Sequence, residues 1–507
     1  MIPLYTPAQV RGMDERAVAS GTPSLVLMER AAGHLARAVV AAGERRYGLR
    51  ALFLCGKGNN GGDGLAAARR LLAWGADARV HLVAGEDGLS HDTGVQLARY
   101  RAAGGRLVAV PSWDGADVIV DCLLGTGSSG APREPYASVV EGVNARGDRR
   151  VAVVACDLPS GVDADTGQVE GVAVGADVTV SLGAHKRGLW LWPARGYCGD
   201  LSVADIGITT SGDEDTPAPA AWVLEDADVR AAVPPAAAAV DKRGRGVVLV
   251  VAGSPGMSGA AIMVARGALA MGVGLLTVAT PQHTRDVVAS AVPEAMTVAL
   301  PDDPAAAFDE IAARLDGVGA LAVGPGLGHD EPTVALVRRL VRDCEVDTVL
   351  DADGLNAFRG EGDALAERRQ GHRLVCTPHA REFARLLGKD EGEVWPDRVN
   401  TLAEAARRWR AEVVAKGPGT IIQSPQGKTL INGTGTAALA TGGTGDVLTG
   451  MIASATAGNP QPHAAAAAVH IHGLAGRIAA ARLTARSVAA LDVAAAIPAA
   501  LADLERA

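Results

Sequence analysis

The chain has 507 residues, which is too long for a single hydrophobic core and predicts two or three domains. Its net charge is −9, from 48 basic and 57 acidic residues, and aromatic residues make up only 3% of it. An acidic chain that is poor in aromatic rings is a poor partner for nucleic acid or for an anionic membrane, so both are excluded as expected partners.

The cysteines and the chain start bear on the cellular compartment. The six cysteines form no CxxC pair and mostly end apolar runs, as Cys55 does. This pattern favours buried free thiols in a reducing cytosol over disulfides or zinc sites. The segment Met1–Pro7 lacks a basic region followed by an apolar core, so no signal peptide is expected, and no apolar run is long enough to cross a membrane. We therefore expect a cytoplasmic protein.

The first half of the chain alternates between strand and helix patterns. Residues 6–42 have helical periodicity with a break at Gly21-Thr22-Pro23. From residue 50, apolar runs alternate with helical stretches such as Leu65–Trp74 and Thr93–Ala103. The runs are Ala51–Cys55, Ala78–Ala84, Arg106–Val110, Val118–Leu124, Val151–Cys156 and Val178–Leu182. This alternation predicts a parallel sheet covered on both faces, whose ligands bind at the carboxyl ends of the strands.

A glycine-rich segment, Gly56–Gly64, leaves the first of these strands and opens a helix. Its glycines formally fit GxGxxG, but a single match is weak evidence, and no acid stands clearly at the end of the second strand. Its core, Asn59-Asn60-Gly61-Gly62-Asp63, offers oxygen ligands for a cation or a sugar as well as a phosphate cradle. The alternative is a turn whose residues were selected for left-handed backbone angles.

Two further strand ends carry a carboxylate beside small residues. Asp121 is followed by Gly125–Ala131, and Asp157 is followed by Ser160-Gly161-Val162-Asp163. Gly183–Gly188 then brings basic side chains to the same edge. Three strand ends of one sheet that each deliver a carboxylate are hard to explain by turns alone, so they predict a polar site.

An acidic segment rich in proline and alanine, at about residues 211–220, predicts a linker. We expect domains at 1–212 and 222–507, joined by a linker at 213–221. Strand and helix patterns then resume, with strands at Val247–Val251, Leu275–Ala279, Ala320–Val323, Thr348–Leu350, Leu374–Cys376 and Glu412–Ala415 and a hairpin near Thr420–Asn432. The second domain is therefore also α/β.

The segment Thr441–Gly450 predicts a tight loop that opens a helix at Asp446. Unpaired N–H groups and the helix dipole make such a start an anion site. A carboxylate there is explained if Asp446 accepts a proton from a hydroxyl that attacks a phosphate; the alternative is a simple N-cap helped by Thr444. Lys416 can hold nucleotide phosphates together with the backbone that follows it. No Walker-A motif occurs, and a catalytic aspartate after a glycine-rich turn resembles the ribokinase-type kinases.

Two sets of motifs resemble known families. Asn59–Gly64, Asp121 with Gly125–Gly127, Asp157–Asp163 and the helix around Leu27-Met28-Glu29 resemble the YjeF N-terminal family of NAD(P)H-hydrate epimerases, from about residue 5 to about 210. Gly324–Gly328, Asp351–Asn356, Thr377–Glu382, Lys416–Thr420 and Thr441–Gly450 resemble the ADP-dependent NAD(P)H-hydrate dehydratases, from about residue 222 to the end. The implied fold is a Rossmann-like three-layer α/β/α domain followed by a ribokinase-like α/β domain.

The resemblance implies a repair enzyme with two activities. It would interconvert the R and S hydrates of NADH and NADPH (NADHX and NADPHX) and dehydrate the S form, converting ADP to AMP and phosphate. It also implies K⁺ in the epimerase domain and Mg²⁺ with ADP in the dehydratase domain. We expect the two hydrates and ADP as partners, and a homo-oligomer.

The resemblance also assigns residues. Asp157 and Asp446 would be catalytic, and K⁺ would bind Asn60, Asp121 and Ser160. Epimerase substrate contacts would be Asn59, Asn60, Gly61, Gly62, Asp63, Gly125, Thr126, Gly127, Ser128, Ser129, Gly130, Ala131 and Asp157. Dehydratase substrate contacts would be Ala260, Gly326, Asp353, His379 and Asp446, and nucleotide contacts Lys416, Gly417, Pro418, Gly419, Thr420 and Gly445.

Some of these residues have simpler interpretations. His379 by itself is more typical of a turn or a helix cap, and His470 and His472 on an alanine-rich helix are expected in the core or on the surface. Two alternative functions stay open. One is a ribokinase-type kinase of a vitamin precursor with an added nucleotide-binding domain, and the other makes the N-terminal domain a non-catalytic association module.

Overall fold

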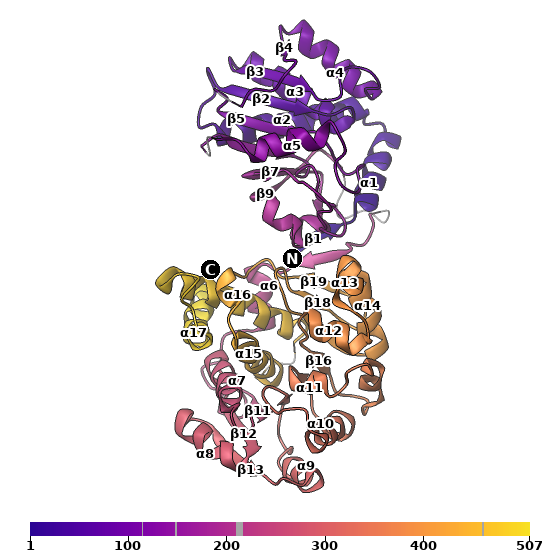
Figure 1. Cartoon of the computed structure of the whole chain (residues 1–507). Coiled ribbons are helices and arrows are strands. Elements are labelled where there is room, and N and C mark those ends of the chain that lie inside the picture. Colours follow the sequence, from indigo (N-terminus) through magenta and orange to yellow (C-terminus); the bar gives the residue numbers. More distant parts are fainter. Residues whose placement is uncertain (114, 148–149, 209–215, 459–460, 507) are drawn as a thin grey trace. The chain divides into compact units, whose positions relative to one another are not determined.

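The computed structural model describes residues 1–507 except 114, 148–149, 209–215, 459–460 and 507. The chain divides into two compact units (Figure 1). The N-terminal unit is Pro3–Ala221, and the C-terminal unit is Trp222–Ala507 with Met1–Ile2. Residues 213–215 of the expected linker lie outside the described residues. Among the described residues, no helix is both long and apolar enough to cross a membrane.

The N-terminal unit is built on a seven-stranded parallel sheet with the order β4-β3-β2-β5-β6-β7-β9. The strands are β2 (Arg50–Cys55), β3 (Asp77–Leu82), β4 (Arg106–Leu107), β5 (Val118–Cys122), β6 (Ala152–Cys156), β7 (Val178–Leu182) and β9 (Asp200–Ala204). The predicted parallel sheet is confirmed. Strand β9 was not predicted because it is a largely exposed edge strand without an apolar run.

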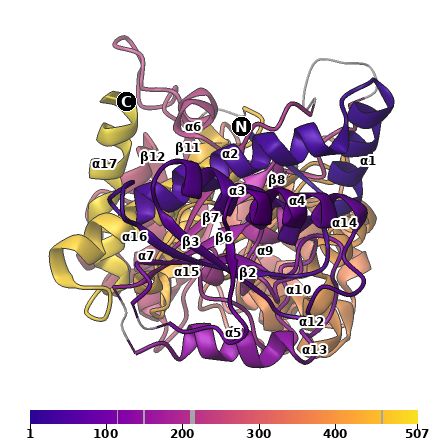
Figure 2. The ribbon, with the colours of Figure 1, turned by 90° about the horizontal axis from the view of Figure 1, so that it is seen from above.

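Helices cover both faces of this sheet (Figure 2). One face carries α2 (Ser24–Ala42), α3 (Asn59–Ala73) and α4 (His91–Ala102), and the other carries α5 (Tyr136–Asn144). Strand β2 is buried on both sides, because Phe53 packs in the cluster of the first face and Leu54 in that of the second. Helix α1 (Pro7–Ala19) follows the short strand β1 (Ile2–Tyr5), which pairs with β8 (His185–Lys186).

Helix α3 begins at Asn59, six residues before the helical stretch expected from Leu65, so the glycine-rich motif lies mostly inside a helix. Close packing explains this. A Cβ on Gly61 would overlap the Gly56 carbonyl oxygen, and one on Gly62 would lie 2.6 Å from Met28 Cε. These glycines therefore serve the contact of α3 with its neighbours, and the prediction that Gly56–Gly64 opens a helix is confirmed.

The C-terminal unit has a larger sheet with the order β13-β12-β11-β14-β15-β16-β17-β18-β19-β10. The strands are β10 (Ala221–Val223), β11 (Val247–Val251), β12 (Leu275–Pro281), β13 (Met296–Leu300), β14 (Ala320–Val323), β15 (Thr348–Leu350), β16 (Leu374–Cys376), β17 (Glu412–Ala415), β18 (Ile421–Gln423) and β19 (Thr429–Ile431). Pairing is parallel from β13 to β17, and β17, β18 and β19 are antiparallel. The predicted hairpin is confirmed, and β13 was not predicted.

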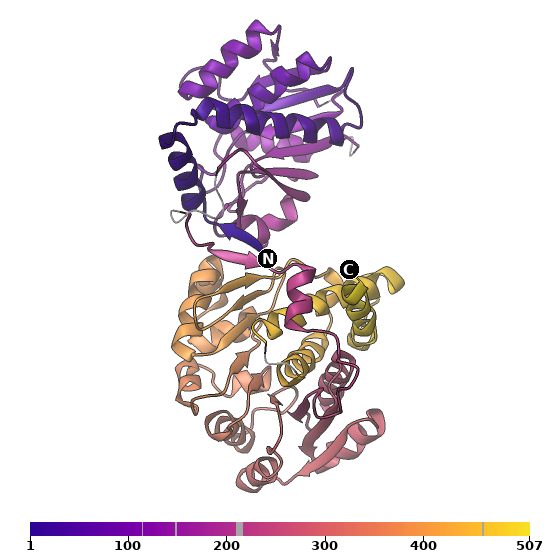
Figure 3. The same cartoon turned by 180° about the vertical axis from the view of Figure 1, so that it is seen from behind.

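Helices lie on both sides of this sheet as well (Figures 1 and 3). One side carries α7 (Ser258–Met271), α15 (Thr444–Gly458), α16 (Ala464–Leu483) and α17 (Ala490–Arg506), and the other carries α10 (Glu331–Asp343), α12 (Ala380–Leu387) and α14 (Arg398–Trp409). The remaining helices are α6 (Asp226–Ala232), α8 (Gln282–Ala291), α9 (Pro304–Ala312), α11 (Asp353–Asn356) and α13 (Glu391–Val394).

Helices α7 and α15 are in unusually close contact. A Cβ on Gly267 of α7 would overlap the Val447 carbonyl oxygen, and one on Gly450 of α15 would overlap that of Val264. Two glycines thus fix the position of the helix that begins at the predicted anion site. The six cysteines are all buried and free, as expected.

Candidate active sites

The strand order of the N-terminal unit brings three predicted segments to one edge. Strands β2, β5 and β6 are neighbours, and Asn59–Asp63, Asp121 and Asp157 lie at or after their carboxyl ends. Parallel strands are roughly 5 Å apart, so the segments that follow β2 and β6 face each other across roughly 10 Å. The sheet therefore brings these acids to one edge, as predicted from their positions at the strand ends.

Asp121 is fully buried beside Ser160. Its Oδ2 accepts a hydrogen bond from the Ser160 backbone N–H (2.8 Å), and its Oδ1 accepts one from Ser160 Oγ (2.7 Å) and one from the Leu123 N–H (3.1 Å). In the described part of the chain no cationic side chain pairs with it. Burial raises the pKa of Asp121 to about 6, although these hydrogen bonds lower it.

Asn60 and Ser160 both form hydrogen bonds with the backbone of Leu124. Asn60 Nδ2 donates to the Leu124 carbonyl (2.9 Å), and Ser160 Oγ accepts from the Leu124 N–H (2.9 Å). Asn60 Oδ1 is buried and has no hydrogen-bond partner. An orphaned amide oxygen and the buried, unpaired carboxylate of Asp121 fit a monovalent cation that binds hard oxygen ligands. The structure thus brings the three predicted K⁺ residues together.

Asp157 forms a buried ion pair with Lys186. Its Oδ1 accepts hydrogen bonds from Lys186 Nζ and from the Leu182 N–H (2.9 Å). Lys186 is 1% exposed and also donates to the Leu182 carbonyl (2.7 Å). Asp157 has a φ of 69°, a backbone state that non-glycine residues seldom adopt away from functional sites. The basic group expected from residues 183–188 is therefore Lys186.

Two other acids surround this pair. Burial raises the pKa of Asp63 well above its usual range, and the charges of Asp157 and Asp14 raise it further. Burial also raises the pKa of Asp14, on α1, to about 6 against the effect of Lys186. The sequence analysis missed Asp14. It lies within ordinary helical periodicity, and only the pairing of β1 with β8, in which Tyr5 is opposite Lys186, brings α1 beside the site.

The remaining predicted substrate contacts form a loop after β5. A Cβ on Gly125 would lie 3.3 Å from Asn60 Cβ, so the loop begins against the oxygen ligands. Residues 127–131 are exposed. This segment borders the site on the solvent side.

In the C-terminal unit, α15 begins at Thr444, two residues earlier than predicted. Asp446 is therefore inside the first turn, and the alternative that it is only an N-cap is wrong. Gly443 has a φ of 90°, and a Cβ there would overlap Met263 Sδ, so the tight turn before the helix requires glycine. Thr444 Oγ1 donates to the Leu439 carbonyl (2.8 Å) and stabilises the turn.

Asp446 is a half-buried acid to which no described residue donates a hydrogen bond. Burial raises its pKa to about 7, and so do the nearby charges of Asp351, Asp353 and Glu382, whereas Lys416 lowers it. A carboxyl group that titrates near neutrality and has no protein partner is suited to proton transfer.

Lys416 lies beside this turn. Its Nζ is 2.6 Å from Asp351 Oδ1 and 3.3 Å from the place where a Cβ on Gly445 would be. Burial lowers the pKa of Lys416, but Asp351 and Glu382 outweigh this effect, so the pKa is raised and the ammonium stays charged. A fixed positive charge next to a helix start strengthens an anion site.

The residues after Lys416 form an open turn. Thr420 Oγ1 donates to the Gly417 carbonyl (3.0 Å), and Gly417 and Pro418 are exposed. The backbone of this predicted nucleotide segment is thus accessible to a ligand.

The predicted substrate residues of this unit lie on neighbouring strand ends. Gly326 has a φ of 68°, and a Cβ there would lie 2.8 Å from Ala260 Cβ, so these two residues are adjacent. Asp353 Oδ2 accepts from the Gly328 N–H (2.9 Å). His379 caps α12, because its Nδ1 accepts from the Arg381 N–H (3.1 Å). Its other ring nitrogen, Nε2, lies 3.5 Å from Glu382 Oε1, and the side chain is 49% exposed.

Sequence analysis did not single out Asp351, Glu382 or Thr449, although all three are in motifs that it identified. An aspartate directly after a strand is the signal that could have identified Asp351. His470 and His472 are both buried, and burial lowers the pKa of His472 to about 4.

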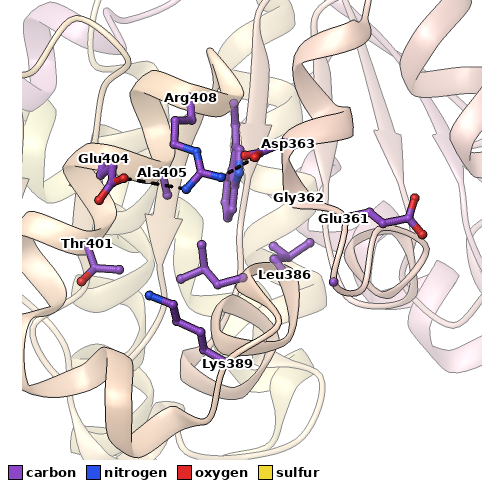
Figure 4. Close-up of a pocket in the computed structure, with 12 residues that line it drawn as sticks. Glu361, Gly362, Asp363, Leu386, Lys389, Thr401, Glu404, Ala405 and Arg408 are labelled. Atoms are coloured by element: carbon purple, nitrogen blue, oxygen red, sulfur yellow. Dashed lines mark hydrogen bonds and ion pairs between the residues drawn. The ribbon is translucent and has the colours of Figure 1, made fainter.

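A separate cavity of about 150 Å³ lies between the outer helices of this unit (Figure 4). Arg408 is paired there with Asp363 and Glu404. None of the predicted site residues lines it. Its lining residues are Gly360, Glu361, Gly362, Asp363, Leu386, Leu387, Lys389, Thr401, Glu404, Ala405, Arg408 and Trp409.

Family models match both units. One described as YjeF-related protein N-terminus matches residues 24–188, and one described as NAD(P)H-hydrate dehydratase matches residues 248–499. The chain is therefore a two-domain α/β enzyme, with a Rossmann-like domain followed by a ribokinase-like domain, as predicted.

Full-length relatives define the family. The bifunctional NAD(P)H-hydrate repair enzymes Nnr of Moorella thermoacetica and Salinibacter ruber are each 38% identical to this chain. The alignments cover 99% of this chain and 97% of the first relative, and 98% of this chain and 95% of the second. The chain belongs to the family of bifunctional NAD(P)H-hydrate repair enzymes. A crystal structure of the ADP/ATP-dependent NAD(P)H-hydrate dehydratase from Bacillus subtilis is 30% identical, with a TM-score of 0.49, covering 56% of this chain and 99% of that one.

Proposed function

We propose that this chain epimerises R- and S-NAD(P)HX in its N-terminal domain and dehydrates S-NAD(P)HX at the expense of ADP in its C-terminal domain. Family membership supports the pair of activities. The main structural support for the dehydratase activity is Asp446, to which no described residue donates a hydrogen bond. It lies beside the charged Lys416 at the start of α15. We place the domains at 1–212 and 222–507.

In the dehydratase site, Lys416 and the backbone of 417–420 hold the nucleotide phosphates, and the first-turn N–H groups from Gly445 face the transferring group. Asp446 accepts the proton of the ring hydroxyl as its oxygen attacks the β-phosphoryl group of ADP, and AMP leaves. Elimination then breaks the ring C–O bond, phosphate departs, and a ring proton is lost to restore NAD(P)H. Phosphorylation is needed because hydroxide is a poor leaving group.

The same site positions the nicotinamide hydrate. Ala260 and Gly326 offer a surface without large side chains, and Asp353 and the half-exposed ring of His379 offer polar contacts. Mg²⁺ bound to ADP would supply positive charge to the phosphate groups. The described residues contain no cluster of three or more His, Cys, Asp or Glu side chains able to hold a metal.

In the epimerase site, Asp157 transfers the proton at the hydrated ring, held in place by Lys186. Asn60, Asp121 and Ser160 would hold K⁺, whose positive charge would offset that of the buried Asp121 carboxylate. The substrate contacts are those of residues 59–63 and 125–131. The orphaned Asn60 Oδ1 supports this ion site.

We further propose a cytoplasmic location and a homo-oligomer. Six buried free thiols support a reducing compartment. Light scattering of the purified chain tests the oligomeric state.

The decisive experiment gives the purified chain both hydrate epimers with ADP and follows the recovery of reduced-nicotinamide absorbance. Full recovery is expected. Recovery that stops at the S fraction would overturn the epimerase proposal, and no recovery would overturn the dehydratase proposal. Release of a stable phosphorylated product would instead support the vitamin-precursor kinase. Parallel reactions with ATP test the preference for ADP.

A further inference from the structure

Thr449 and Asp351 connect the start of α15 to Lys416. Thr449 is fully buried on α15, one turn after Gly445, and its Oγ1 lies 2.6 Å from Asp351 Oδ2. The other carboxylate oxygen, Asp351 Oδ1, lies 2.6 Å from Lys416 Nζ. Asp351 directly follows β15 and Lys416 directly follows β17, so three separate elements meet through one carboxylate.

Thr449 has a local alternative. Its Oγ1 is also 3.1 Å from the Gly445 carbonyl, the contact that a threonine usually makes inside a helix. A hydroxyl has one proton, however, and a carboxylate at 2.6 Å is the stronger acceptor. The proton therefore goes to Asp351, and the contact has a role beyond the helix itself.

Asp351 is 1% exposed, so each of its oxygens needs a partner. Loss of the Thr449 hydroxyl would leave one oxygen unsatisfied and allow the carboxylate to rotate. Lys416 would then lose its fixed direction toward Gly445, because Asp351 is its closest charged partner.

We propose that Thr449 and Asp351 are positioning residues that fix the Lys416 ammonium at the first turn of α15, where it receives the phosphates of the nucleotide. This inference rests on the proposed function, which makes Lys416 a nucleotide contact.

The same carboxylate influences Asp446. The charged groups that face Asp446 are Asp351 after β15, Lys416 after β17, Asp353 on α11 and Glu382 on α12. Replacing Asp351 by asparagine removes one negative charge and frees Lys416, and both changes favour the ionised form of Asp446. Replacing Thr449 leaves all four charges in place.

The test measures ADP and S-NADHX kinetics separately. In Thr449→Val we expect KM for ADP to rise about tenfold, the cost of one hydrogen bond to a charged group, while KM for S-NADHX changes little. Thr449→Ser should restore the KM for ADP. Thr456→Val is the matched control, since Thr456 is a similarly buried threonine on the same helix.

In Asp351→Asn we expect a higher KM for ADP and, in addition, a shift of the acid limb of the pH–rate profile to lower pH. Thr449→Val should leave that limb in place. Epimerase activity gives the amount of folded N-terminal unit, and thermal unfolding of each variant shows whether the C-terminal unit is folded. If Asp351→Asn fails to fold, the KM values of Thr449→Val and Thr449→Ser test the proposal without it.

Three results would overturn the inference: an unchanged KM for ADP in Thr449→Val, an equal rise of both KM values, or the same effect in Thr456→Val. A wild-type chain without ADP-dependent recovery of NADH would instead refute the proposed function, so the two failures are distinguishable.

Discussion

Each unit places a lysine–aspartate ion pair, with a largely buried aspartate, at the carboxyl ends of parallel strands, but the two pairs differ in one respect. In the N-terminal unit Lys186 is paired with Asp157, the acid proposed for proton transfer. In the C-terminal unit Lys416 is paired with Asp351, and the proposed base Asp446 stays without a hydrogen-bonded partner.

The difference shows that the position of one lysine decides which of the surrounding acids forms an ion pair and which acids stay unpaired. One acid forms an ion pair with the lysine, and burial together with neighbouring negative charges raises the pKa of acids that lack such a pair. In the C-terminal unit the unpaired acid is Asp446, whose pKa rises to about 7. In the N-terminal unit the unpaired acids are Asp63, whose pKa is raised well above its usual range, and Asp14, whose pKa rises to about 6.

The largest expected effect comes from the unpaired base. Asp446→Asn should lower kcat/KM of the dehydratase by at least about 100-fold, because general-base catalysis contributes that much, and should leave epimerase activity unchanged. Both rates are measured on one preparation by reduced-nicotinamide absorbance and epimer exchange. Asp302→Asn, at an exposed aspartate, is the control. Equal losses of both activities would contradict independent sites.

The paired acid should show a double effect. Asp157→Asn should lower the epimerase rate by about 100-fold. It should also destabilise the N-terminal unit by about 3 kcal/mol, because Lys186 is left as a buried, unpaired charge. Thermal unfolding and epimer exchange measure the two effects. The double variant Asp157→Asn/Lys186→Met should regain stability but not epimerase activity. Recovery of epimerase activity would refute the catalytic role of Asp157.

The pH dependence follows from the raised pKa of Asp446. A general base works when ionised, so the dehydratase rate should fall about tenfold per pH unit once the pH drops below about 7. Rates across the acid range, at saturating ADP, measure this limb. A limb near pH 4, the range of an ordinary aspartate, would show that the environment of Asp446 does not shift its pKa in solution.

Removal of K⁺ should affect only the N-terminal unit. Exchange of K⁺ for a bulky organic cation should slow epimerisation and lower the unfolding temperature of this unit by a few degrees, since an ion at 100 times its Kd stabilises by about 2.7 kcal/mol. Asn60→Ala should abolish this response, because it removes the orphaned oxygen. A response that persists in Asn60→Ala would place the ion elsewhere.

The smallest effect concerns the scaffold of α15. Gly450→Ala should destabilise the C-terminal unit by about 1–3 kcal/mol, because the new Cβ would overlap the Val264 carbonyl oxygen of α7. Gly259→Ala on α7 is the matched control, since its Cβ would meet only Met263 Cε at 4.0 Å. Thermal unfolding compares them, and equal midpoints would show that α7 and α15 can separate without cost.

Much of the fold was predictable because its signals are local. The alternation of apolar runs and helical stretches predicted the parallel sheet of the first unit and the α/β class of the second, and the apolar surroundings of the cysteines predicted buried thiols. The predicted starts of the helices were less accurate. Gly61 and Gly62 resemble a turn in the sequence, but they lie inside α3, where Gly56 and Met28 leave no room for a Cβ.

The sequence by itself determined the two domains, the family, and the carboxylates at the strand ends, because residue spacing and motifs are properties of the chain alone. Only the tertiary structure decided which acid pairs with which lysine. Asp351 and Lys416 are separated by 65 residues, and Asp157 and Lys186 by 29. Asp14 reaches its site through the pairing of β1 with β8. The electrostatic state of a buried acid depends on these distant neighbours, and no local pattern in the sequence records them.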